Sequence, residues 1–144
     1  MEKRILGSTG KMLSVIGFGG IIVMDETRKD AATYVARAVD RGINYFDVAT
    51  QYGNAQEILG PALKPYRKDV FLACKTLDRT KKGSKKELYN SLKKLRTSYF
   101  DLYQFHGVKT SDEVTQILGP DGALETFIEA KDKGLIRYLG FTAH

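Results

Sequence analysis

Cysteine is almost absent from this chain, and long apolar runs are missing. The single cysteine, Cys74, excludes a disulfide within the chain, which is typical of proteins from a reducing compartment. Residues 1–7 lack the apolar core of a secretory signal. No apolar run approaches the length of about 20 residues that a membrane-spanning helix needs. These absences predict a cytoplasmic protein without a membrane partner.

The composition is that of a globular protein with a basic surface. Of the 144 residues, 42% are hydrophobic and 28% charged, and the formal net charge is +6. The basic residues concentrate at 67–68, 79–86 and 93–94. The last two stretches lie beside and on one predicted helix, so we interpret them as its solvent-exposed face. We therefore expect no nucleic-acid partner. A nucleic-acid-binding module stays as an alternative, which would require strong, salt-dependent binding.

Strand and helix patterns alternate along the chain. A hairpin turning at residues 7–10 precedes a short apolar strand at 15–20. The other predicted strands are 43–48, 70–75, a segment within 99–108, and 136–141. The predicted helices are 28–41, 55–63, one that begins at a capping box of Ser84 and Glu87, and 123–133. The first helix is expected to bury Ala32, Val35, Ala36 and Val39, and the last one Leu124, Phe127 and Ile128.

Such alternation is typical of parallel βαβ units, in either a doubly wound sheet or a (β/α) barrel. Gly17-Phe18-Gly19-Gly20 has no third glycine at the spacing of a dinucleotide-binding turn, which counts against the doubly wound alternative. We predict a single α/β domain over residues 1–144. Its architecture is a partial (β/α)8 TIM barrel, with an N-terminal hairpin and five parallel strands.

Polar side chains stand at the carboxyl ends of consecutive predicted strands. Asp47 ends the second strand and Tyr52 follows it, while Lys75 and His106 end the third and fourth. Strand ends of a parallel barrel converge on one face, where catalysis takes place. The period of two places Asp47, Lys75 and His106 toward the barrel axis, and the residues between them toward the helices.

Together these four residue types suit the reduction of a carbonyl group, which needs a hydride and a proton. A tyrosine can donate the proton, but its reference pKa of about 10 is high. A nearby ammonium group, held by a carboxylate, favours the phenolate, and a histidine can bind the substrate oxygen. No metal is needed. Each residue alone also has an ordinary explanation, such as helix capping by Asp47 or solvation of Lys75; their joint occurrence favours the chemical one.

At this point the chain resembles the aldo-keto reductase family. The resemblance covers the whole chain and rests on four segments: residues 44–60, 72–76, 101–106 and 134–142. It implies that Tyr52 is the general acid, that Lys75 and Asp47 tune it, and that His106 orients the carbonyl.

The same resemblance implies a cofactor, NADPH or less often NADH, and a small carbonyl substrate. Cofactor-binding residues would be Gly20, Ile21, Asp47 and Thr142. Two departures stand out: Val48 replaces a frequent threonine, and Ala143 replaces a frequent asparagine, for which His144 could compensate.

Length is the largest departure from the family. A complete (β/α)8 barrel needs about 250 residues. We therefore expect three strands and about half of the cofactor site to lie outside this chain, and little or no turnover by the chain alone. The exposed sheet edges would invite self-association. The alternative function is a truncated, non-catalytic relative that acts as a binding or regulatory subunit.

Overall fold

The computed structural model describes residues 1–143. Its elements, in chain order, are β1 (Lys3–Ile5), the 3-10 helix η1 (Gly7–Thr9), β2 (Met12–Ser14), β3 (Phe18–Gly19), η2 (Gly20–Val23), α1 (Arg28–Asp40), β4 (Tyr45–Asp47), α2 (Ala55–Leu63), η3 (Lys64–Tyr66), β5 (Phe71–Thr76), α3 (Lys81–Lys94), β6 (Phe100–Phe105), α4 (Ser111–Leu118), α5 (Ala123–Asp132) and β7 (Ile136–Phe141). No helix within this range is long and apolar enough to cross a membrane.

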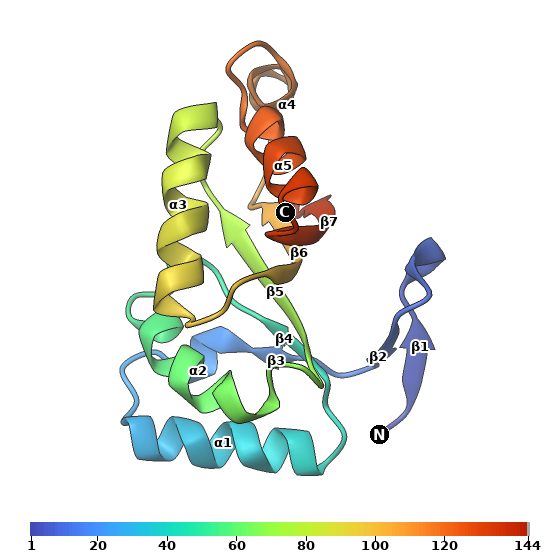
Figure 1. Cartoon of the computed structure of the whole chain (residues 1–144), viewed down its shortest axis with the longest axis vertical. Coiled ribbons are helices and arrows are strands. Elements are labelled where there is room, and N and C mark those ends of the chain that lie inside the picture. The colour runs from blue at the N-terminus through green and yellow to red at the C-terminus, as the bar shows by residue number, and fades with distance from the viewer. Residues whose placement is uncertain (144) are drawn as a thin grey trace.

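The main sheet has five parallel strands in the order β3-β4-β5-β6-β7. Spatial order equals chain order, without the reversal that a doubly wound sheet shows at its switch point. Figure 1 shows α1, α2 and α3 on one side of the sheet and the β1–β2 hairpin on the other. The predicted architecture, an N-terminal hairpin followed by five parallel strands of a partial barrel, is confirmed.

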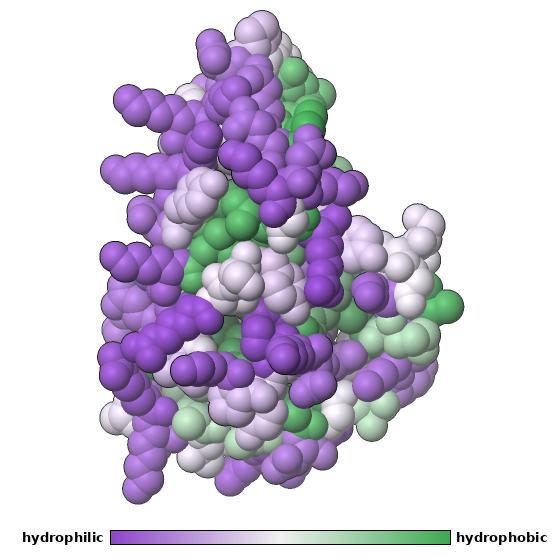
Figure 2. All heavy atoms as spheres, in the orientation of Figure 1, coloured by the Kyte–Doolittle hydropathy of each residue, from purple (hydrophilic) through white to green (hydrophobic). Residues whose placement is uncertain are grey.

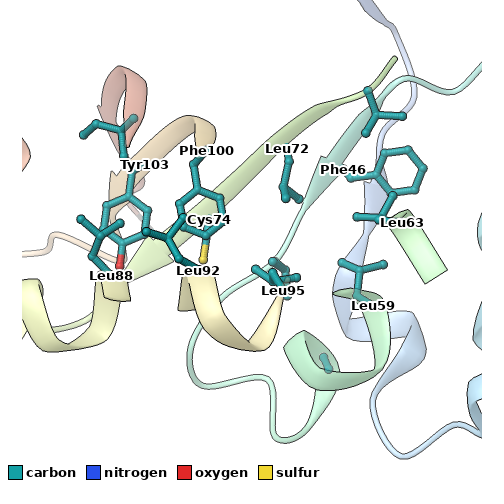
Figure 3. Packing of buried hydrophobic residues seen from close by; sticks show 14 of the residues in the cluster. Phe46, Leu59, Leu63, Leu72, Cys74, Leu88, Leu92, Leu95, Phe100 and Tyr103 are labelled. Carbon is teal, nitrogen blue, oxygen red and sulfur yellow. The ribbon is translucent and has the colours of Figure 1, made fainter. Parts of the chain in front are cut away.

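Alternation along the strands separates a helix-facing layer from an inner face. Phe46, Cys74 and Tyr103 point toward the helices, where they pack against leucines of α2 and α3 (Figure 3). Burial raises the pKa of the Cys74 thiol to about 12, so this cysteine is a core residue and not a nucleophile. Their neighbours Asp47, Lys75 and Gln104 contact one another on the opposite face. The predicted division between the two faces is therefore confirmed.

Helix starts differ from the sequence prediction in two places. The helix α3 begins at Lys81 with Thr80 as its N-cap, so the capping box predicted at Ser84 and Glu87 is wrong. The Glu87 carboxylate instead accepts hydrogen bonds from the Thr76 hydroxyl and from the Leu77 amide. A real capping box lies at Thr110 and Glu113, at the start of α4, a helix that the sequence analysis did not predict.

The bounds of the strand β3 and the buried faces of α1 and α5 also differ from the prediction. The strand β3 covers only Phe18–Gly19 of the predicted 15–20. Before it, the amide of buried Ser14 binds the Asn44 side chain and the Ser14 hydroxyl binds the Ile16 carbonyl, in place of strand pairing. Ala32 is exposed on α1, where Ala31 and Ala38 join Val35 in the core. Ile128 is 51% exposed on α5. In both helices the face that packs against the core is therefore shifted by about one residue from the predicted face.

A buried carboxylate fastens the amino end of the sheet. Asp101, at 2% exposure, accepts hydrogen bonds from Arg67 at 3.0 Å, from Arg137 at 2.7 Å and from the Leu72 amide at 2.9 Å. Both guanidinium groups also lie over the Tyr99 ring, at 4.0 and 4.3 Å from its centroid. One side chain thus ties β5, β6 and β7 together.

Asp101→Asn should therefore lower the free energy of unfolding by up to about 3–5 kcal/mol, because it leaves the buried Arg67 guanidinium without its counter-charge. The control is Glu2→Gln, which removes an exposed ion pair with Arg4 and should cost about 0.5 kcal/mol or less. Urea denaturation of the three proteins measures both values. Equal stability of Asp101→Asn and Glu2→Gln would contradict this account.

Candidate active site

A buried ion pair joins the carboxyl ends of β4 and β5. Asp47 is the last residue of β4, and the Lys75 ammonium forms an ion pair and hydrogen bond with its Oδ1. The two strands are registered so that Asp47 lies beside Ala73, two residues before Lys75. Lys75 is only 5% exposed. Because a buried ammonium group without a counter-charge is strongly destabilising, Lys75 depends on Asp47.

The second oxygen of Asp47 faces two polar groups of the same inner face. Tyr45 donates its hydroxyl to Oδ2 at 3.4 Å, and the Gln104 amide nitrogen lies 3.5 Å from the same atom. Burial and then the negative charge of Asp47 raise the pKa of Tyr45 above its usual value. Tyr45 therefore stays neutral and acts as a donor to the carboxylate.

Tyr52 reaches the ion pair from the loop between β4 and α2. The loop turns tightly: the Tyr52 amide binds the Ala49 carbonyl at 3.3 Å, and the Ala55 amide binds the Tyr52 carbonyl at 2.9 Å. The Lys75 ammonium nitrogen lies 5.5 Å from the centroid of the Tyr52 ring. Tyr52 is half-buried and packs against the core, so its ring is held beside the positive charge.

His106 follows the last residue of β6 and faces Tyr52. Its amide binds the Thr76 carbonyl at 2.9 Å, which extends the pairing of β5 and β6 by one residue. The two rings meet edge to face, with centroids 6.2 Å apart and an interplanar angle of 88°. His106 Nδ1 lies 3.0 Å from the Gln51 amide oxygen.

The structure thus brings together all four residues that the sequence predicted at the strand ends. Asp47, Tyr52, Lys75 and His106 form one continuous series of contacts at the carboxyl end of the sheet. Among residues 1–143, no group of three or more His, Cys, Asp or Glu side chains could hold a metal ion.

The residues predicted to touch a cofactor lie at the same end of the sheet. Gly20 packs so closely on the next strand that a Cβ atom there would lie 2.8 Å from Val48 Cβ and 2.9 Å from the Asp47 carbonyl oxygen. Ile21, the next residue, is exposed. The Thr142 hydroxyl accepts a hydrogen bond from the Gly107 amide at 2.8 Å, so it already has a partner in the chain. His144, which was expected to compensate for Ala143, lies outside the described residues.

Three side chains that contact the predicted site were missed as site residues. Gln51 binds the His106 ring and Gln104 faces Asp47. Arg79 was assigned to a solvated helix face, which is wrong: it is 9% exposed and binds the main chain of His106. Its position four residues after Lys75, between a strand end and a helix start, was the available signal. Three of the four lysines in that basic stretch, Lys82, Lys85 and Lys86, are exposed as predicted, whereas Lys81 is partly buried and pairs with Glu125 and Glu129.

Comparison with known proteins identifies the class. Residues 15–144 match the Aldo/keto reductase family, and the chain belongs to it. It is 35% identical to an oxidoreductase of Bacillus subtilis, YqkF, over 99% of this chain and 49% of that protein. It is 33% identical to the NAD(P)H-dependent D-xylose reductase of Pachysolen tannophilus, over 69% of this chain and 32% of that one.

A solved structure supports the same assignment. The holo form of an aldo-keto reductase from Bacillus halodurans superposes with a TM-score of 0.86 at 33% identity, covering 99% of this chain and 50% of that one. The described sheet is thus part of the barrel of this family. The chain spans about half the length of these full-length relatives.

The dependence of Lys75 on Asp47 can be measured in a double-mutant cycle. Asp47→Asn should lower the free energy of unfolding by about 3 kcal/mol, since it leaves the buried ammonium group unpaired. Adding Lys75→Met to this variant removes the orphaned charge and should restore most of the loss. If Lys75→Met restores nothing, the ion pair is not what stabilises this end of the sheet.

Proposed function

We propose that the protein carrying this chain is an NAD(P)H-dependent oxidoreductase that reduces an aldehyde or ketone to an alcohol. One observation carries the proposal: in a member of the aldo/keto reductase family, Asp47, Tyr52, Lys75 and His106 contact one another at a single strand-end site. The D-xylose reductase among the relatives supports both the reaction and the type of cofactor.

The residues present suit a nicotinamide cofactor. A dihydronicotinamide supplies a hydride, and the complementary requirement is a proton donor beside a positive charge, which Tyr52 and Lys75 provide. Ile21 offers exposed apolar surface at the edge of the site, and Gly20 lets η2 approach β4 closely. We propose that Gly20, Ile21, Asp47 and Thr142 border the bound cofactor, with NADPH preferred over NADH.

Each side chain has a distinct part in the proton transfer. Tyr52 would donate its hydroxyl proton to the carbonyl oxygen. A bound dihydronicotinamide would supply the hydride for the carbonyl carbon, which would give an alcohol and the oxidised cofactor. Lys75 stabilises the negative charge that develops on the Tyr52 oxygen, and Asp47 keeps the Lys75 ammonium group in place. His106 donates a hydrogen bond to the substrate oxygen and orients the carbonyl group toward Tyr52.

Turnover should depend on structure beyond the five strands described above. Phe141, the last residue of the edge strand β7, is 69% exposed, so that edge of the sheet is uncovered. The chain spans about half the length of its relatives, and a complete (β/α)8 barrel needs about 250 residues. We expect residues 1–144 alone to show little or no turnover, and robust reduction of a simple aldehyde by this chain would contradict that expectation.

Tyr52→Phe tests the proposed chemistry in the protein as purified from its source cells. Loss of the proton donor should lower kcat for aldehyde reduction about 10²–10⁴-fold, while the affinity for NADPH, measured by fluorescence titration, stays near the wild-type value. The matched control is Tyr89→Phe, an exposed tyrosine on α3 that should leave both quantities unchanged. A Tyr52→Phe variant with wild-type kcat would refute the assignment.

A second candidate function, a partner-binding subunit, is favoured by the apolar edge at β7. A hollow of about 270 Å³ there is lined only by apolar side chains: Phe105, Val108, Val114, Ile117, Leu118 and Phe141. Apolar atoms are visible beside the hydrophilic surface in the region of α4 (Figure 2). At the opposite edge of the sheet, Ile21 and Ile22 follow the edge strand β3 and are exposed. We propose that these edges make the chain self-associate.

Phe141→Lys should weaken that association, because it places a charge in the apolar hollow and on a free strand edge. Light scattering coupled to size-exclusion chromatography, across a concentration series of the chain, measures the effect. Ile5→Lys, an equally exposed apolar residue on the hairpin, is the control and should not change the mass. A wild-type chain that stays monomeric throughout would contradict the proposal.

A further inference from the structure

The guanidinium group of Arg79 lies beneath the turn that carries His106. Arg79 belongs to the loop between β5 and α3, and its Nη2 donates to the His106 carbonyl oxygen at 2.7 Å and to the Gly107 carbonyl oxygen at 3.3 Å. The side chain is 9% exposed. An arginine that had only to keep the surface basic would project into solvent, as the lysines of α3 do.

The main chain of Arg79 is itself firmly held. Its carbonyl oxygen accepts the Ala123 amide at 2.9 Å, at the start of α5. The neighbouring Asp78 carboxylate accepts the Thr80 amide at 2.8 Å. A Cβ atom on Gly83 would lie 1.8 Å from the Asp78 carboxylate, so glycine is what allows this loop to pack on α3. The guanidinium group therefore extends from a rigid base.

On its other side, Arg79 is bound by the first turn of α4. Its Nε and Nη2 donate to Glu113 Oε1 at 3.1 and 2.9 Å. The other oxygen, Glu113 Oε2, accepts the amides of Lys109 and Thr110. These main-chain donors, followed by Arg79, lower the pKa of Glu113 below its usual value, so the carboxylate is charged at neutral pH. One ion pair thus fixes both ends of residues 106–110.

The turn after His106 requires such support. Gly107 has a φ of +62°, a left-handed conformation that an extended strand does not adopt and that favours glycine. Thr142 holds the Gly107 amide from the side of β7, and Arg79 holds the two carbonyl oxygens from the side of β5. The main chain of His106 is thus held on both flanks, at the position from which its ring meets Tyr52 edge to face.

A contribution to the stability of the fold does not by itself explain why a guanidinium group is buried beneath the turn at His106 and Gly107. Arg79 Nη1 is buried and has no hydrogen-bond partner among the described residues, which costs free energy. Buried ion pairs can often be replaced by apolar side chains without loss of stability. We propose that Arg79 is a positioning residue for His106: it binds the main chain of His106 and Gly107 and thereby sets the imidazole against Tyr52.

The chemical value of this arrangement rests on the proposed function, in which His106 orients the carbonyl group. The geometry can be tested without turnover, by nuclear magnetic resonance of the 144-residue chain. The chain has two histidines, so a His144→Gln variant assigns the ring signals of His106. The readouts are the cross-relaxation peak between the His106 and Tyr52 ring protons and the chemical shifts of the His106 ring.

Arg79→Met keeps the length of the side chain and removes its donors. It should abolish the peak between the two rings and shift the His106 ring signals, and Arg79→Lys, which keeps one charged donor, should restore the peak in part. The matched control is Arg67→Met. Arg67 also binds two main-chain carbonyls and a carboxylate, but at the amino end of the sheet. Its loss should reduce stability and leave the His106 signals unchanged.

Three results would overturn the proposal: an Arg79→Met variant with an unchanged ring-to-ring peak, an Arg67→Met variant that loses the peak equally, or a wild-type chain without the peak. None of them depends on activity. Failure of this inference is therefore distinguishable from failure of the proposed function, which depends on the kcat of Tyr52→Phe.

Discussion

The ion pair between Lys75 and Asp47 is the interaction around which the carboxyl end of the sheet is organised. An ammonium group on a fully buried strand is tolerable only with a counter-charge at hand, and the strand register supplies one from β4. Tyr45 and Gln104 face the remaining carboxylate oxygen, and the Tyr52 ring lies beside the ammonium group. The buried charge is thus stabilised by Asp47 and lies next to the aromatic ring of Tyr52.

Much of this arrangement could be predicted from the sequence, because it follows from two regularities. Parallel strands separated by helices bring their carboxyl ends to one edge, and alternation along each strand sends neighbouring side chains to opposite faces. Asp47 and Lys75 are each the inward-facing polar residue at such an end, while Phe46 and Cys74 beside them enter the helix-packed core. Neither inference requires knowledge of long-range contacts beyond the strand order.

Features that depend on contacts across the sequence escaped prediction. In the sequence, Arg79 belongs to a basic stretch. Only the fold shows that its guanidinium group binds the carbonyl of His106, 27 residues further along the chain. The pattern Ser84–Glu87 satisfies the local rule for a capping box, but Thr80 is the cap: its hydroxyl accepts the Gly83 amide, and the next amide, of Lys81, is bound by the distant Asp121 carbonyl. The strand β3 is shorter than its apolar run, and the residue before that run, Ser14, is bound through its amide to the Asn44 side chain 30 residues further along. In each case a tertiary contact overrides a local preference.

Isotope transfer tests most directly the proposal that a carbonyl group is reduced at the strand-end site. The protein from its source cells would be incubated with a simple aldehyde and a nicotinamide cofactor that carries deuterium at the hydride position. The account predicts an alcohol that carries deuterium on the former carbonyl carbon, formed together with oxidised cofactor. If the cofactor binds but no deuterium enters the alcohol, or none is formed, then the site of Asp47, Tyr52, Lys75 and His106 does not perform this reaction.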